Sequence, residues 1–215
     1  MIRNYFTKNF IFLALLLVAG PSWAAHPLIT DDTGTQGRGN FQLELTGQYD
    51  RDKENVGGVS VKATGVETAA TLSYGILDHV DLVLSLPYLW GKEKENDIVV
   101  YDEDGISDAS LEAKIKVFEK EGFSLALKPG ISLPTGDEDK GLGTGKFGGQ
   151  IFLIASQEVE PFTFHVNLGY VRNENDADER ESIWHASVAA VWEVVKDLSL
   201  VANIGVERNP DSEAD

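Results

Sequence analysis

The sequence predicts an all-β protein whose strands form an antiparallel, up-and-down transmembrane β-barrel. Three observations predict this class. Apolar and polar residues alternate strictly over many segments, short and long connections alternate between these segments, and the N-terminus has the pattern of an export signal.

The first 24 residues predict a cleaved secretory signal peptide. Arg3 and Lys8 give a positive start, an apolar run covers residues 10–18, and small residues at Ser22 and Ala24 precede the cleavage point. A membrane-spanning helix needs ~20 apolar residues, about twice this run, so an anchor helix is disfavoured. Residues 25–39 are then expected to form a periplasmic N-terminal segment, and residues 40–215 the outer-membrane β-barrel of a Gram-negative bacterium.

Strand periodicity is the strongest signal. In residues 40–50, Phe41, Leu43 and Leu45 fall on one face, and Gln42 and Glu44 on the other. A period of two indicates a strand with one apolar and one polar face. Most such segments have the ~9–11 residues that a tilted strand needs to cross a bilayer, longer than is usual in a β-sandwich. Nine segments show the pattern: 40–50, 66–76, 80–90, 109–117, 123–133, 147–155, 162–170, 184–192 and 198–206.

The connections alternate in length. Tight turns are expected near residues 77–79, 119–122, 158–161 and 195–197, and long charged loops at 50–58, 91–107, 134–146 and 172–182. Bacterial barrels have short periplasmic turns and longer extracellular loops. Nine strands would be an odd number, whereas bacterial single-chain barrels have an even one. Either the C-terminus is truncated, or a strand is overlooked within 26–39 or 95–101.

Aromatic side chains gather near the strand ends. Amphipathic rings prefer the membrane–water interface, which predicts two aromatic girdles, although aromatic residues are also common in strands generally. The predicted interface residues are Tyr49, Tyr74, Tyr88, Trp90, Tyr170, Trp184 and Trp192.

Composition excludes several function classes. Removal of residues 1–24 changes the net charge from −17 to −19, which disfavours nucleic acid as a partner. The chain has no Cys, so it has neither disulfides nor thiolate chemistry. No Gly-x-Ser-x-Gly motif and no paired His spacing occurs, so we expect no enzyme activity, no cofactor and no metal site. The acidic loop clusters lack the spacing of a Ca²⁺ loop and are interpreted as a solvated surface.

Several motifs together resemble the outer-membrane family named for the MetA pathway of phenol degradation, whose members are also labelled "transporter". The similarity covers most of the mature chain, in the order His26 to Thr33, Tyr74 to Asp78, Ser85 to Tyr88, Gly105 to Asp108, Leu111 to Lys114, Leu133 to Asp137 and Gly141 to Gly145. The resemblance implies a barrel of about twelve strands, of which about nine are present here. It also implies passage of small aromatic compounds and brings no catalytic residues.

The polar faces of the strands supply the expected lumen lining. Two interpretations stay open for these groups: a mixed-charge lining that sets selectivity, or mutual pairing that plugs a narrow barrel. Phe152, Ile154 and Val201 also point inward, either toward an apolar solute or against an inserted loop or the N-terminal segment. The titratable candidates are Glu44, Glu67, Glu112, Lys114, Lys116, Lys128, His165 and His185. Asp81 and Glu193 lie on the same polar faces.

The predicted function is a channel or transporter for small, aromatic or hydrophobic molecules. The alternative is a structural or adhesive barrel with a closed lumen and acidic extracellular loops; a membrane-embedded hydrolase is disfavoured because no nucleophile constellation is visible. The expected partners are the lipid bilayer and lipopolysaccharide, the outer-membrane assembly machinery and a small-molecule solute.

Overall fold

A computed structural model describes residues 29–175, 179–196 and 198–210. The predicted signal peptide lies outside these residues. Within them the chain forms ten strands: β1 (Phe41–Val56), β2 (Val59–Leu77), β3 (Val80–Glu95), β4 (Ile98–Ile106), β5 (Ala109–Lys120), β6 (Phe123–Leu133), β7 (Gly148–Val159), β8 (Phe162–Arg172), β9 (Ser182–Val195) and β10 (Leu198–Glu207).

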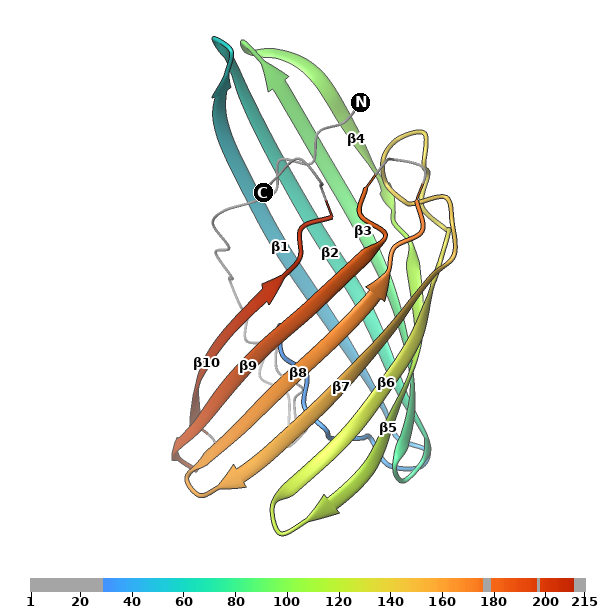
Figure 1. The fold of residues 1–215 in the computed structure, drawn as a ribbon, viewed down its shortest axis with the longest axis vertical. Coiled ribbons are helices and arrows are strands. Elements are labelled where there is room, and N and C mark those ends of the chain that lie inside the picture. The colour runs from blue at the N-terminus through green and yellow to red at the C-terminus, as the bar shows by residue number, and fades with distance from the viewer. Residues whose placement is uncertain (1–28, 176–178, 197, 211–215) are drawn as a thin grey trace.

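All strands belong to one antiparallel sheet that is curled as a half-barrel (Figure 1). The strand order is β1-β2-β3-β5-β6-β7-β8-β9-β10, and β4 pairs with the upper part of β3. Each strand therefore lies beside its sequence neighbour, which confirms the predicted up-and-down arrangement. β1 and β10 are the two edges, and in the described residues they do not pair with each other.

The tight turns at 78–79, 121–122 and 160–161 lie together at one end of the sheet, here called the lower end (Figure 1). At the opposite, upper end, loop 134–147 connects β6 to β7, and residues 173–175 and 179–181 follow β8 and precede β9. The predicted alternation of short and long connections is therefore present for β5 to β9.

The predictions of long loops at 50–58 and 91–107 are wrong. β1 pairs with β2 up to Val56 and Val59, and β3 continues to Glu95 before β4 returns beside it. The turns are the residue pairs Gly57-Gly58 and Asn96-Asp97, all four with positive φ, which suits the twist of a tight hairpin. Charged residues occupy both faces here, so the apolar period is lost while the backbone ladder continues. The overlooked strand is β4, and residues 29–39 contain none.

The two faces of the half-barrel have opposite chemistry. On the convex face, large apolar side chains such as Leu43, Leu86 and Leu168 are exposed. On the concave face, polar side chains such as Asp81, Asn167 and Ser187 are buried. In a water-soluble protein, charged residues are rarely buried and contiguous exposed apolar patches are small. The two faces of this sheet have the opposite arrangement.

Aromatic residues form two rows across the convex face. In the lower row, Phe41 pairs with Tyr74 and Phe162 with Trp192. In the upper row, Tyr170 pairs with Trp184, and Tyr49 and Trp90 both pair with Val66. We call the convex surface between these rows the apolar band. Phe162 and Tyr170 are eight residues apart, as are Phe41 and Tyr49, so the band measures roughly 26 Å along a strand at ~3.3 Å per residue.

Among the described residues, there is no helix with the length and apolar character required to cross a membrane.

Candidate functional site: the polar interior

The N-terminal segment, residues 29–40, runs along the inside of the curved sheet before β1 begins. Its final turn is fixed to the end of β2 by two backbone hydrogen bonds, Gly39 N to Gly75 O (2.8 Å) and Gly75 N to Asn40 O (2.9 Å). A Cβ at Gly75 would overlap the Gly37 carbonyl. Glycine at position 75 is therefore what allows this close approach.

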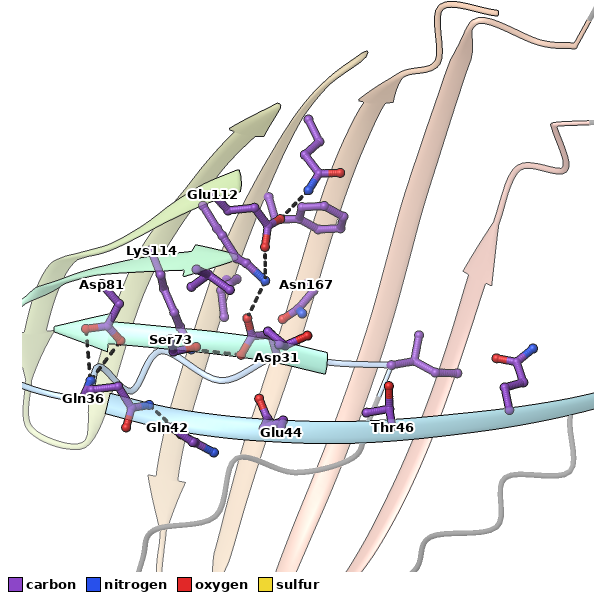
Figure 2. A pocket seen from close by; sticks show the side chains of 18 of the residues that line it. Asp31, Gln36, Gln42, Glu44, Thr46, Ser73, Asp81, Glu112, Lys114 and Asn167 are labelled. Atoms are coloured by element: carbon purple, nitrogen blue, oxygen red, sulfur yellow. Dashed lines mark hydrogen bonds and ion pairs between the residues drawn. The ribbon is translucent and has the colours of Figure 1, made fainter. Parts of the chain in front are cut away.

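Asp31 is the centre of an ion-pair cluster on the concave face (Figure 2). Its carboxylate accepts hydrogen bonds from Lys114 Nζ on β5 (2.9 Å) and Lys128 Nζ on β6 (3.2 Å). Lys128 Nζ also lies 3.1 Å from Glu112 Oε2, and Glu112 accepts a hydrogen bond from the Gln150 amide on β7. A segment next to β1 is thereby connected to three strands in the middle of the sheet.

The charge state of Asp31 follows from these neighbours. Burial alone would raise its pKa, but the ammonium groups of Lys114 and Lys128 outweigh burial and lower the pKa to about 2. Asp31 is therefore an anion at all physiological pH values, held between two cations. With its amide group oriented to satisfy its hydrogen bonds, the Asn167 side chain accepts from Asp31 N (2.6 Å) and donates to Asp31 O (2.9 Å).

A second contact fixes the segment farther along its length. Both Asp81 oxygens accept from the Gln36 N–H (2.9 and 3.1 Å), and the Gln36 side chain donates to Gln42 (2.6 Å). Asp81 is only 1% exposed. This carboxylate on β3 is buried because the N-terminal segment covers it and supplies its donor.

Hydroxyl groups make the third contact. Thr33 Oγ1 lies 2.5 Å from Ser124 Oγ, and Thr33 N donates to Ser156 Oγ (3.3 Å). Ser156 Oγ is in turn 2.8 Å from His165 Nδ1, a Ser–His pair that the sequence pattern did not reveal. Ser156 and His165 are both buried, and Thr33 lies over the serine hydroxyl. The pair therefore anchors the N-terminal segment through the serine hydroxyl.

Beside the segment lies a cavity of about 510 Å³. Its wall combines carboxylates, two lysines and amides with an apolar part formed by Ile29, Val83, Phe152 and Ile154. A cavity of this size falls within the range of small-molecule sites in proteins. The mixture of charges with one aromatic ring suits a small solute that has both polar and apolar parts.

The structure brings together five of the eight predicted lumen residues around this cavity: Glu44, Glu67, Glu112, Lys114 and Lys128. Lys116 lies elsewhere, near the lower end, where its Nζ is 3.1 Å from Glu119 Oε2. His165 and His185 are inward but not in the cavity wall. His185 lies between Glu207 (3.2 Å) and Ser187 (3.0 Å), with its ring 5.7 Å from that of Phe152.

Of the three apolar residues expected inside, Phe152 and Ile154 line the cavity and Val201 is 40% exposed on β10. Asp31 and Gln36 were not singled out from the sequence as site residues of the interior. Asp81 alternates with apolar neighbours on β3, which places it on the polar face, and it lies buried in the cavity wall. Asp31 and Gln36 lie in a segment without periodicity, so no local signal indicates their inward position.

At the upper end, Asp108 fixes the loop between β6 and β7. Its carboxylate accepts from Gly136 N (3.0 Å), Thr144 N (2.7 Å) and Thr144 Oγ1 (2.7 Å). A Cβ on Gly136 would overlap the Leu142 carbonyl oxygen, and a Cβ on Gly143 would overlap the Asp108 carboxylate. The separate Gly- and Asp-containing sequence motifs at 105–108 and 133–145 thus form one folded unit.

Fold and interior together define a curved antiparallel sheet with a polar concave face, an apolar convex face and an N-terminal segment inside the curve. The chain belongs to the family described as "Putative MetA-pathway of phenol degradation", whose model matches residues 30–213. The family predicted from the sequence motifs is confirmed. No curated protein matches the chain.

Proposed function

We propose that the protein is an outer-membrane β-barrel that passes small molecules, including aromatic ones, across the membrane. The observation that carries this proposal is the inversion of its two faces. Charged groups such as Lys114 and Asp81 are buried inside the curve, while Leu, Val and aromatic side chains face outward over the whole apolar band. Lipid is the surrounding that makes such an arrangement favourable, because it accepts the outer face without a hydrophobic penalty.

The dimensions of the apolar band support a membrane location. Its length of roughly 26 Å along the strands is close to the ~25 Å apolar belt of outer-membrane barrels, allowing for strand tilt. Aromatic rows at both edges match the interfacial preference of Tyr and Trp. In this proposal the lower end, with its tight turns, faces the periplasm, and the upper end with loop 134–147 faces outward.

Passage of a solute is supported by the cavity. Lys114, Lys128 and Glu112 offer both signs of charge, and Phe152 offers an aromatic face. A small aromatic acid or alcohol could contact both. The family description, which refers to phenol degradation, agrees with this solute class. The N-terminal segment then acts as a gate, because its contacts to Lys114, Asp81 and Ser156 would have to loosen for the cavity to open along its length.

A structural barrel with a closed lumen is the second candidate. The same N-terminal segment favours it, since residues 29–40 fill part of the interior and are held by ion pairs and hydrogen bonds from the four strands β3, β5, β6 and β7. In this alternative, the exposed charged surface at the upper end would act by contact with other molecules.

Conductance separates the two candidates. The protein purified from outer membranes is reconstituted into planar bilayers and into liposomes, and solute entry is measured with arabinose and with benzoate. We expect conductance above that of protein-free bilayers, and a further increase for Gly75→Ala, which displaces residues 37–40 and so loosens one end of the N-terminal segment. Gly47→Ala is the matched control, because a Cβ there meets nothing closer than 4.0 Å. No passage by the wild type or by Gly75→Ala would overturn the transport proposal and favour the closed barrel.

A further inference from the structure

Above the upper aromatic row, strands β1, β2 and β3 continue as a tall hairpin extension whose two faces carry opposite charge (Figure 1). The alternation of the strands places one set of side chains on the same face as Tyr49 and Trp90. The residues of this set are Arg51, Lys53, Lys62, Lys92 and Lys94, here called the basic face. The opposite face carries Asp50, Asp52, Glu54, Glu93 and Glu95.

The basic face is only partly neutralised. Lys62 Nζ lies 2.5 Å from Asp97 Oδ1, and Lys92 pairs with Asp102. Arg51, Lys53 and Lys94 have no carboxylate within ion-pair distance among the described residues. Five cations thus gather on one side of three neighbouring strands in a chain whose net charge is −17. Lys62 lies directly opposite Lys53 and Lys94 in the ladder, and such like-charge pairs are unfavourable, so an anion on that side would stabilise them.

The basic face also contains a hollow of about 190 Å³. Its wall consists of Tyr49, Arg51, Thr64 and three lysines, Lys62, Lys92 and Lys94. A phosphate group is small enough to enter such a hollow, and Arg and Lys are the side chains that bind phosphate best. The tyrosine at its lower edge belongs to the upper aromatic row, so the hollow begins where the apolar band ends.

The height of these cations above the upper aromatic row favours lipid headgroups as the source of the phosphate. Arg51 and Lys92 are two residues above Tyr49 and Trp90, and Lys53 and Lys94 are four residues above them. At ~3.3 Å per residue, the cations lie roughly 7–13 Å beyond the row along the strand, or roughly 5–10 Å along the membrane normal at the ~40° tilt of barrel strands, which places them next to lipid headgroups. A soluble polyanion would approach a strongly acidic molecule against repulsion, whereas a lipid headgroup is already next to the convex face.

We propose that the basic face binds the phosphate groups of outer-leaflet lipid headgroups, which is the chemistry that lipopolysaccharide presents. The proposal rests on the membrane location proposed above. The apolar band would contact the acyl chains, the aromatic row the sugar–chain boundary, and Arg51, Lys53 and Lys94 the phosphates. The acidic face would then point away from lipid, toward the axis of the barrel.

The test compares lipid A binding by the wild-type protein in a zwitterionic detergent with binding by Arg51→Gln/Lys53→Gln/Lys94→Gln. Each cation near an anionic lipid surface contributes a factor of about five, so the triple variant should bind at least tenfold more weakly. The matched control is Asp50→Asn/Asp52→Asn/Glu54→Gln on the opposite face, which should bind lipid A at least as well as the wild type. Monophosphoryl lipid A should bind more weakly than the diphosphorylated form.

Three outcomes would overturn the proposal: equal lipid A binding by the wild type and the basic-face variant, an equal loss in the acidic-face control, or displacement of lipid A by millimolar inorganic phosphate, which would indicate a site for the free ion. Membrane fractionation of the same variants distinguishes this failure from failure of the membrane location. If the wild type resists carbonate extraction but does not prefer lipid A, the barrel proposal stands and the headgroup site does not. If the wild type is extracted by carbonate, the membrane location itself fails.

Discussion

Strands β1 to β3 run through two regions, the apolar band and the extension above the upper aromatic row, which differ in how side chains alternate between the two faces. In the apolar band, alternate residues differ in polarity: Leu43 and Leu45 face outward, and Gln42 and Glu44 face the cavity. In the extension above the upper aromatic row, alternate residues of β1 and β3 differ in the sign of their charge, as Asp52 and Lys53 do. The backbone ladder is continuous through both regions. The difference therefore reflects what each face contacts and not the secondary structure.

The largest effect is expected from a charge placed in the middle of the apolar band. Val166 is four residues from both Phe162 and Tyr170, and it is 40% exposed on the convex face of β8. An Arg at the midplane of a lipid-facing strand costs ~2–4 kcal/mol of folding free energy. Val166→Arg should lose that amount in urea unfolding from phospholipid vesicles.

Ser60→Arg provides the control for this prediction. Position 60 has the same outward parity on β2 but lies in the extension, six residues beyond Val66. An Arg at this height costs ~0–1 kcal/mol. Equal destabilisation by the two substitutions would mean that height above the aromatic row is irrelevant, and the distinction between the two regions would fail.

A second large effect is expected on the concave face. Lys128→Met removes the cation that pairs with both Asp31 and Glu112, and leaves two carboxylates close together with less compensation. An unpaired charge that is mostly shielded from water costs ~1–3 kcal/mol. Lys128→Met should be destabilised by about 2 kcal/mol in the same unfolding assay, with part of the loss restored by adding Glu112→Gln.

Lys116→Met is the matched control for the lysine cluster. Its partner, Glu119, is 66% exposed, and exposed ion pairs contribute only ~0–1 kcal/mol. If Lys116→Met and Lys128→Met have the same effect, the interior cluster does not hold the N-terminal segment in place.

A smaller effect is expected at the point where the N-terminal segment meets β2. Gly75→Ala should displace residues 37–40, because its methyl group would overlap the Gly37 carbonyl. The two backbone hydrogen bonds lost are worth ~1–2 kcal/mol together. The Gly39 and Gly75 amides should exchange hydrogen faster in this variant than in Gly47→Ala. The exchange rates of amides in strands β5 to β9 should be the same in both variants. Unchanged protection in Gly75→Ala would contradict the close approach.

The smallest effect concerns pH. The pKa of Asp31 is lowered to about 2 from an ordinary value of 3.8, so its stabilising contribution is fully present above pH 3.8 and is lost as the pH falls through about 2. Pepsin cleavage within residues 29–40 should therefore begin only near pH 2 in the wild type. Asp31→Asn should be cleaved already at pH 4. Cleavage of the wild type beginning at pH 4 would mean that the lysines do not hold this carboxylate.

The apolar band could be predicted from the sequence because one physical rule, a period of two in polarity, applies to every strand in it. The same rule placed Lys114, Lys128 and Glu112 on the inner face, where they are found. It failed for residues 50–58 and 91–107, since charges on both faces such as Asp52 and Lys53 look like a loop. There, the turn pairs Gly57-Gly58 and Asn96-Asp97 were the available signal.

The arrangement of the interior could not be predicted for a different reason. Asp31 meets Lys114 and Lys128 across 83 and 97 residues of sequence, and the N-terminal segment has no periodicity that marks an inward side. Such a contact depends on the curling of the whole sheet around the segment. Sequence alone could state that the lumen groups would be either a lining or a plug, and the structure places both a cavity and a segment among them.

Site-directed spin labelling at two adjacent positions tests most directly whether the convex face contacts lipid. The chain has no Cys, so Leu86→Cys and Ser85→Cys each give a single label, one outward in the apolar band and the other on the concave face beside Thr71. In vesicles, we predict that the Leu86 label is relaxed by oxygen and not by a water-soluble nickel chelate, and that the Ser85 label shows the reverse. A Leu86 label that is accessible to the nickel chelate, or shielded from both reagents, would contradict the account.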